Sequence, residues 1–441
     1  MKNLKFIHTG DIHLGSFLHI GGNPLPPAVT EASETATLEG FSRVCRAAVS
    51  NKVDFIVISG DLFDREARSV KAMDFFAQEC RCLDDAGIGV FVIAGNHDPL
   101  REQQDLFVLP DNVKIFGGEE PEIFEVLDED DSLKARIIGQ SYQNSREQRK
   151  IHLDYDELDS GAWNIALLHT QLESGNSNYV PCSAAELRGR EDIHYWALGH
   201  IHKNIIINDE KPYIVYSGIP QGRDFGETGQ GGCYLVEMDP VKGNSIDFIP
   251  LSPVVYKRAD IFIDHQKDSP PQTLDDLTDM IKEECERMLE NIDEDGEHPI
   301  KGYVIQWTLR GRGDIHNLLR EQEQEYMDRL AEDLRSRYGN KSPFIWTELI
   351  RLRTQPQIDY ETLMANNPVF GQLEGVIEKC LEEEETKTRI VKELGDIWKG
   401  KGDHEEWEDF RFHLDDDTLE DMLDKAKQLI LEKWAEGSER E

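Results

Sequence analysis

The chain has 441 residues, 39% of them hydrophobic, and a formal net charge of −39. This length and hydrophobic content allow two or three domains with real cores and exclude a disordered chain. The charge excludes a free-standing, high-affinity nucleic-acid binder, because most of the surface would repel a phosphate backbone. Any nucleic acid handled by this chain needs a local positive centre or a basic partner.

The spacing of the cysteines and the length of the apolar runs indicate the cellular compartment of the protein. The seven cysteines are scattered and never spaced as Cys-x-x-Cys, so neither a disulfide framework nor a zinc knuckle is predicted. The amino terminus shows no apolar signal region, and no apolar run approaches the roughly 18 residues that cross a bilayer. We therefore expect a soluble protein of the reducing cytoplasm.

Strands and helices alternate over the first hundred residues. Apolar runs predict strands over 5–9, 53–59 and 89–94, and helical spacing predicts helices over 30–51 and 69–86. This alternation indicates βαβ units with a parallel sheet. Ligands of such sheets bind at the carboxyl ends of the strands, where each of these strands meets a polar cluster.

A second sheet is predicted further along the chain. Short strands between 113 and 142 indicate a meander-like arrangement, and buried strands over 163–169 and 194–199 each lead into histidine. Three more strands are predicted over 213–217, 232–238 and 245–250. Together with the first sheet they make up a predicted domain over residues 1–255.

The rest of the chain divides into two parts. Residues 256–355 predict a small α+β module, with helices from about 273 and over 314–338 and strands over 302–309 and 343–352. Residues 356–441 are rich in carboxylates and helix formers, which predicts an acidic helical region.

Carboxylate, amide and imidazole side chains follow five of the predicted strands. The candidates are Asp11, His13, Asp61, Asn96, His97, Asp98, His169, His200 and His202. Oxygen and imidazole ligands without a thiol suit Mn²⁺, Mg²⁺, Fe, Co²⁺ or Zn²⁺. A set of this size can hold two ions about 3.5–4 Å apart, and Asp61, after the central strand, is the natural bridge between them. Such a pair would be a positive centre inside an acidic protein.

Each cluster taken alone has a common explanation. Asp-x-His occurs often by chance, Gly-Asp after a strand is usually a turn, and a lone histidine is more often a packed core residue than a ligand. All the clusters together, each after a predicted buried strand, indicate a metal site.

The segments HTGDIHLG, GDLFD, AGNHD and GHIH together resemble the calcineurin-like metallophosphoesterase superfamily, and within it the Mre11 and SbcD nucleases of DNA double-strand-break repair. The resemblance is specific to about residue 240, looser to about 355 and only compositional beyond. It implies an α/β fold: a two-sheet β-sandwich flanked by helices, a small α+β capping domain and a helical C-terminal tail.

The resemblance also implies roles for individual residues. One ion would be bound by Asp11, His13, Asp61 and His202. The other would be bound by Asp61, Asn96, His169 and His200.

Four further residues receive roles outside the ligand set. His97 would stabilise the scissile phosphate or protonate the leaving 3′ oxygen, and Asp98 would orient it. Asp64 stands where archaeal and eukaryotic members often have histidine and is a candidate to support the ligands. Arg223, in the glycine-rich loop after the last ligands, could contact phosphate, although a solvated loop arginine explains it equally well.

The function implied is a Mn²⁺-dependent phosphodiesterase that cleaves DNA ends as exonuclease and endonuclease, through a water activated by two ions. It would be the nuclease subunit of an SMC-like ATPase of the Rad50 or SbcC kind, which would bind residues 356–441. The helix from Thr30 could form a homodimer face, as in the family. Two alternatives stay open: hydrolysis of a small phosphodiester or phosphomonoester on the same fold, and an assembly subunit with weak nuclease activity. The intact ligand set argues against the assembly subunit, and the acidic surface keeps the small substrate open as an alternative.

Overall fold

The computed structural model describes residues 1–356, except 23, 65–68, 103–108, 129, 174–177, 265–269, 293–297 and 322, and short helical pieces between 372 and 426. The chain forms two compact units. One comprises 1–261, 278–309 and 323–352, and the other 262–277, 310–322 and 353–441. The predicted boundaries at 255 and 355 stay predictions, and most of the predicted partner-docking region lies outside the described residues.

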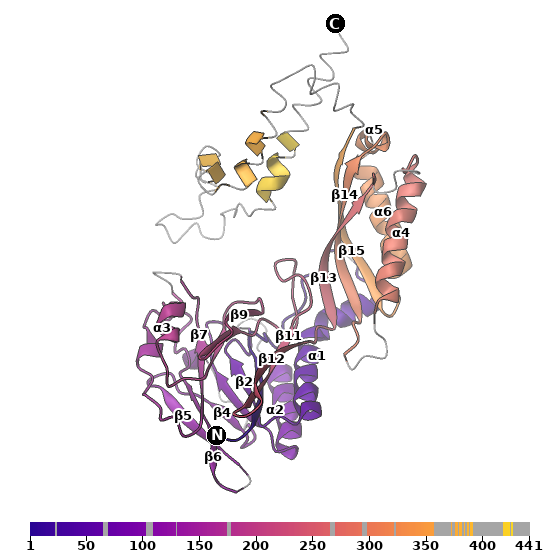
Figure 1. The fold of residues 1–441 in the computed structure, drawn as a ribbon. Helices are drawn as coiled ribbons and strands as arrows, with labels where there is room; N and C mark the ends of the chain where they lie inside the picture. The colour runs from indigo at the N-terminus through magenta and orange to yellow at the C-terminus, as the bar shows by residue number, and fades with distance from the viewer. Residues whose placement is uncertain are drawn as a thin grey trace. The chain divides into compact units, whose positions relative to one another are not determined.

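The first sheet has six strands in the order β12-β11-β1-β2-β3-β4. They are β1 (Leu4–Thr9), β2 (Phe55–Ser59), β3 (Gly89–Ile93), β4 (Val113–Ile115), β11 (Gly232–Asp239) and β12 (Gly243–Pro250). Strands β1 to β4 are parallel, as the βαβ pattern predicts, and β11 pairs antiparallel with β1. The crossover helices α1 (Pro27–Asn51) and α2 (Val70–Asp85) cover the outer face of this sheet (Figure 1).

The second sheet also has six strands, in the order β5-β6-β7-β8-β10-β9. They are β5 (Glu122–Leu127), β6 (Leu133–Gly139), β7 (Trp163–His169), β8 (Tyr195–Gly199), β9 (Ile205–Asn208) and β10 (Tyr213–Tyr216). The meander-like arrangement predicted over 113–142 is confirmed for β5 and β6, which pair antiparallel, whereas β4 pairs in parallel with β3 of the first sheet. Further along, β6, β7, β8 and β10 pair in parallel. The long stretches before β7 and β8, the second of which contains α3 (Ala184–Arg188), leave room for the crossovers that parallel pairing requires. The predicted two-sheet fold flanked by helices is confirmed.

The two sheets pack face to face through aromatic and β-branched side chains. Phe6 of β1 is fully buried; its ring stacks on Phe55 with centroids 5.1 Å apart and meets Tyr195 of β8 edge-on at 5.2 Å. This contact joins neighbouring strands of the first sheet to the centre of the second. It therefore holds together the two sheets whose edges carry the candidate site.

A third sheet of three strands follows, in the order β13-β14-β15. The strands are β13 (Val254–Phe262), β14 (Gly302–Arg312) and β15 (Phe344–Gln355). Helices α4 (Leu274–Glu290) and α6 (Glu323–Tyr338) lie along it (Figure 1). The single helix expected over 314–338 is described as two, α5 (Ile315–Glu321) and α6, and β13 was not expected as a strand. Among the described residues, no helix is both long and apolar enough to cross a membrane.

We expect Phe6→Ala to lower the free energy of unfolding by about 3–5 kcal/mol, because it removes a fully buried ring and leaves a cavity between the sheets. Urea unfolding followed by tryptophan fluorescence measures the change. Phe17→Ala is the matched control, since its side chain is 62% exposed and its loss should cost no more than about 0.5 kcal/mol. Equal effects of the two substitutions would contradict the packing role.

Candidate metal centre

The carboxyl ends of strands from both six-stranded sheets meet at one place. Gly199, the last residue of β8, lies so close to β2 that a Cβ atom there would overlap the Ser59 carbonyl group. Gly60, with φ +101°, lies equally close to the His169 ring. These close approaches bring the residues after β1, β2 and β3 next to those after β7 and β8.

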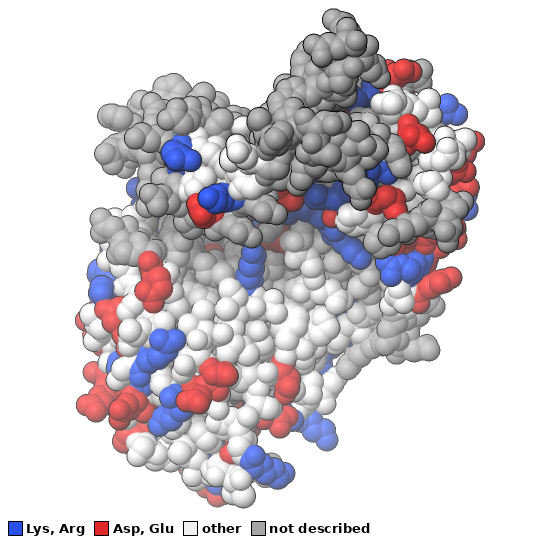
Figure 2. All heavy atoms as spheres, turned by 45° about the horizontal axis from the view of Figure 1, so that its top comes forward, with Lys and Arg blue, Asp and Glu red and all other residues white. Residues whose placement is uncertain are grey.

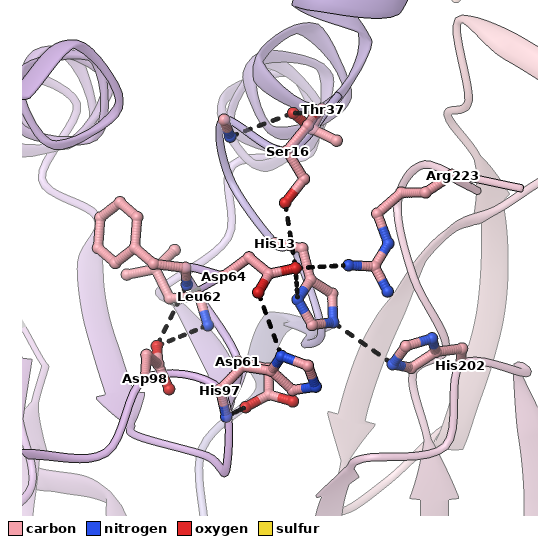
Figure 3. Close-up of polar contacts among 12 residues, drawn as sticks. His13, Ser16, Thr37, Asp61, Leu62, Asp64, His97, Asp98, His202 and Arg223 are labelled. Atoms are coloured by element: carbon pink, nitrogen blue, oxygen red, sulfur yellow. Dashed lines mark hydrogen bonds and ion pairs between the residues drawn. The ribbon is translucent and has the colours of Figure 1, made fainter. Parts of the chain in front are cut away.

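One group of ligand-type atoms comprises Asp11, His13 and His202, within 4.8 Å of one another. His13 Nε2 lies 3.4 Å from His202 Nε2 (Figure 3). The Nδ1 atom of His202 is 2.6 Å from the Glu227 carboxylate, to which its N–H donates. Nε2 of His202 thus directs a lone pair toward His13. Metal-binding histidines are held in this way, with the second ring nitrogen bound to a carboxylate.

A second group comprises Asp11, Asp61 and His169. His169 Nδ1 donates to the Ser59 carbonyl oxygen at 2.9 Å, so its Nε2 faces Asp61 Oδ2 at 3.4 Å and Asn96 Oδ1 at 2.9 Å. Asn96 Oδ1 also lies 3.1 Å from His200 Nδ1, which places His200 beside this group.

The seven predicted metal ligands therefore come together, although they come from five separate segments of the chain. Asp11 belongs to both groups of ligand-type atoms, whereas Asp61, the predicted bridge, belongs to the second. The division of the ligands between two ions, and the bridging role of Asp61, stay predictions.

The chemistry of these atoms fits a cation. A neutral His169 that donates through Nδ1 has only a lone pair at Nε2, and that lone pair faces the oxygens of Asp61 and Asn96. Electron-pair donors in contact repel one another unless a proton or a metal ion lies between them. The buried Nδ1 atom of His13 also has no hydrogen-bond partner. Divalent ions of the oxygen- and imidazole-binding class would satisfy this arrangement.

Burial favours metal binding at two of the histidines and opposes it at the carboxylates. It lowers the pKa of His13 and of His200 to about 3, so both rings are neutral and can donate a lone pair at neutral pH. Burial alone would raise the pKa of Asp61, but the protonated forms of His169, His13 and His97 lower it, which keeps Asp61 ionised. Despite burial, Asp61 in turn raises the pKa of His169 to about 9, so in the absence of a metal ion a proton lies between the two side chains. Burial raises the pKa of Asp11 to about 6.

The backbone at the centre is strained. Four of the candidate ligands have positive φ angles: Asp11 (48°), His13 (45°), Asp61 (49°) and His200 (93°). Non-glycine residues adopt such angles at a cost that the surrounding structure must offset, and these residues are frequent at functional sites. The strain turns the side chains after β1, β2 and β8 inward.

His97 lies at the open side of the centre. Its side chain is 40% exposed, and its Nδ1 is 3.3 Å from Asp64 Oδ1. The hydrogen bond to Asp64 raises the pKa of His97 despite partial burial. The backbone N–H of His97 donates to Asp61 at 2.8 Å, which fixes the residue beside the second ligand group.

Asp98 is a buried carboxylate that joins two loops. It accepts hydrogen bonds from the backbone N–H groups of Leu62 at 2.9 Å, Phe63 at 3.2 Å and Gly95 at 2.7 Å (Figure 3). Asp98 thus holds the loop after β2 against the loop after β3. The orienting role that the sequence assigns to Asp98 stays a prediction, and the carboxylate at His97 Nδ1 is that of Asp64.

Arg223 forms a largely buried ion-pair network. It donates to Asp64 Oδ2 at 3.1 Å and to Glu227 Oε1 at 3.0 Å, and its side chain is 15% exposed. The alternative of a solvated loop arginine is therefore wrong, while a contact with phosphate stays a prediction. Sequence reasoning missed Glu227, because no spacing rule connects it with His202, which lies 25 residues earlier.

A cavity of about 530 Å³ opens beside this network. Its lining includes Ser16, Phe17, Lys71, Asp64 and Arg223, from the loops after β1 and β2, from α2 and from the glycine-rich loop. The cavity provides space for a substrate group next to Arg223 and Asp64, the carboxylate that contacts His97.

Comparison with known proteins finds similar sequences for the part of the chain that carries this centre. Residues 4–204 match the family model described as calcineurin-like phosphoesterase. The chain is 28% identical over 439 residues to the uncharacterized metallophosphoesterase YhaO of Bacillus subtilis, covering 98% of each chain. It is 28% identical over 255 residues to the DNA double-strand break repair protein Mre11 of Methanocaldococcus jannaschii, covering 55% of this chain and 64% of that protein.

The crystal structure of a dimetal phosphatase from Danio rerio aligns with 56% of this chain and with 98% of the phosphatase chain, at 11% sequence identity. Its TM-score of 0.34 is too low to support an argument about this chain. The family match indicates a hydrolase of phosphoester bonds that uses divalent metal ions. Over residues 4–204 the chain is therefore similar to the calcineurin-like phosphoesterases, and this similarity fits the metallophosphoesterase superfamily.

Proposed function

We propose that this chain is a Mn²⁺-dependent phosphodiesterase that cleaves DNA ends, as exonuclease and endonuclease, in DNA repair. The observation that carries the proposal is the gathering of all seven predicted ligands beside His97. The similarity to proteins named DNA double-strand break repair protein Mre11 in several archaea supports DNA as the substrate.

Asp11, His13, Asp61 and His202 would hold one ion, and Asp61, Asn96, His169 and His200 the other. Bound ions of this class neutralise phosphate charge and lower the pKa of water toward about 7.

His97 acts from the exposed side of the centre. Asp64 raises the pKa of His97, which favours the protonated ring. That proton can be donated to a phosphate oxygen or to the leaving 3′ oxygen. Arg223 holds Asp64 in place and lines the cavity together with it. The residues that bind and protonate the substrate thus lie on one side of the ligand set.

The acidic surface bears on how DNA is held. On the described part of the face in Figure 2, Lys and Arg side chains are interspersed with Asp and Glu, without a continuous basic stripe. The net charge of −39 disfavours long-range attraction of DNA. We therefore include in the proposal a partner, a cytoplasmic coiled-coil ATPase of the SMC class, which binds residues 356–441 and supplies a basic DNA-binding surface. The proposal also includes a homodimer formed through α1.

A second candidate is hydrolysis of a small phosphodiester or phosphomonoester. The acidic surface favours it, since a small substrate reaching the centre needs no extended basic surface.

We expect His97→Ala to lower the rate of DNA cleavage with Mn²⁺ by about 10²- to 10⁴-fold, because the proton donor to the leaving oxygen is lost. End-labelled duplex, single-stranded and hairpin DNA measure the rate, and metal content should stay at the wild-type level. The control is Val241→Ala, because Val241 is 91% exposed and lies in the turn between β11 and β12. Full DNA cleavage by the His97 variant would contradict the role.

The same assay separates the two candidate functions when bis(p-nitrophenyl) phosphate is included. Hydrolysis of this compound by the wild-type chain without cleavage of any DNA, with and without an added coiled-coil ATPase, would favour the small substrate. Hydrolysis of neither, despite bound metal, would contradict both.

We expect Asp61→Asn to weaken Mn²⁺ binding by at least roughly tenfold, because a buried charged ligand becomes neutral. Metal content after gel filtration, measured by mass spectrometry, reports the loss. Asp224→Asn is the matched control, since this carboxylate is 49% exposed and outside both ligand groups. Wild-type metal content in the Asp61 variant would exclude Asp61 as a ligand.

A further inference from the structure

A second cluster of ligand-type side chains lies outside the residues assigned to the metal centre. His152, Cys182 and Glu186 each direct one ligand-type atom to a common place, with these atoms within 4.8 Å of one another. They come from the 3₁₀ turn Ile151–Leu153 and the start of α3. Cys182 packs with Ile151 and Trp196 on the face of the second sheet that does not contact the first.

His152 is the residue that packing alone does not explain. It is 3% exposed, and neither Nδ1 nor Nε2 has a hydrogen-bond partner. Buried polar atoms are nearly always paired, so two unpaired nitrogens on one ring need an explanation. Burial lowers the pKa of His152, which leaves a neutral ring with a lone pair to donate. Its Nε2 lies 3.9 Å from Glu186 Oε2.

Cys182 supplies a thiol to the same place. It is 5% exposed and directly precedes Ser183, the residue that caps α3. Burial raises the pKa of the thiol to about 12, so without a metal the sulfur keeps its proton. A bound cation lowers such a pKa and converts the thiol into a thiolate ligand.

Glu186 already has a structural role. Its Oε1 lies 2.6 Å from Lys150 Nζ, and its Oε2 accepts from the Ser183 backbone N–H at 2.8 Å within a capping box. The capping box explains Glu186 and Ser183 completely. It explains neither the unpaired nitrogens of His152 nor the closeness of the Cys182 sulfur to the ring, since that thiol donates to the Ser183 carbonyl oxygen at 3.6 Å.

We propose that His152, Cys182 and Glu186 bind one thiophilic divalent cation of the Zn²⁺ class. Thiolate, imidazole and carboxylate give three ligands, and the 31% exposure of the Glu186 side chain leaves a fourth position to water. On binding, the S–H bond of Cys182 breaks, its proton passes to solvent, and the sulfur forms a bond to the metal. The cation joins the 3₁₀ turn to the start of α3.

Ligand chemistry separates this cluster from the first centre. Thiolate ligands favour Zn²⁺ over Mn²⁺ and Mg²⁺, whereas the candidate ligands of the first centre are all oxygen and nitrogen atoms. The two kinds of site are therefore expected to take up different ions from a mixture.

Cobalt(II) is the probe, because thiolate ligands give it an intense near-ultraviolet charge-transfer band that oxygen and nitrogen ligands do not. We expect the full chain loaded with Co²⁺ to show this band and to bind one more ion than Cys182→Ala. Added Zn²⁺ should abolish the band. We expect Glu186→Gln, which keeps an acceptor for the capping box, to weaken Co²⁺ binding at this site by roughly tenfold.

Cys82→Ser is the matched control, because Cys82 is the exposed cysteine of the chain and should contribute nothing to the band. Far-ultraviolet circular dichroism of metal-free Cys182→Ala tests its fold, and Cys182→Ser is the second variant. A wild-type chain without the thiolate band, or a band that persists in folded Cys182 variants, would overturn the proposal. None of these results depends on nuclease activity.

Discussion

The close approach of the two six-stranded sheets at one edge is the constraint on which the candidate centre depends. It requires a residue without a side chain at Gly199, where any Cβ would meet the Ser59 carbonyl. Between the two sheets, the Phe6 ring packs against Phe55 of its own sheet and Tyr195 of the other, which holds the sheets face to face. Since parallel strands carry their loops at the same end, this one contact brings residues almost two hundred positions apart, such as His13 and His202, within 3.4 Å.

That convergence has an electrostatic cost. Buried carboxylates and neutral imidazoles meet with their lone pairs directed at one another, and four of the residues have strained backbone angles. Such an arrangement is unfavourable in the absence of a positive charge, which divalent ions would supply. The whole chain is acidic, so an anionic substrate would be attracted only where positive charge is concentrated, as it would be at bound divalent ions.

Around the ligands, a network of charged side chains positions the groups that face the substrate. Asp64 contacts both His97 and Arg223, and Glu227 contacts both Arg223 and His202. The candidate proton donor is therefore coupled to the ligand set through a largely buried arginine. The cluster at His152 and Cys182 differs in kind: it is held by the outer face of the second sheet and includes sulfur, so its preference among metals would differ from that of the main centre.

The sequence by itself determined the two-sheet fold class, the strands that end in ligands and the full set of candidate ligands, because buried parallel strands are long apolar runs followed by short polar motifs. Only the tertiary structure decided that β6, β7, β8 and β10 are parallel, that Asp64 rather than Asp98 lies at His97 Nδ1, and that Glu227 holds His202. Such contacts join residues from loops of irregular length, and no local periodicity encodes which of many carboxylates will lie beside a given histidine. The pairing of strands and side chains across the sandwich is set by how the two sheets pack.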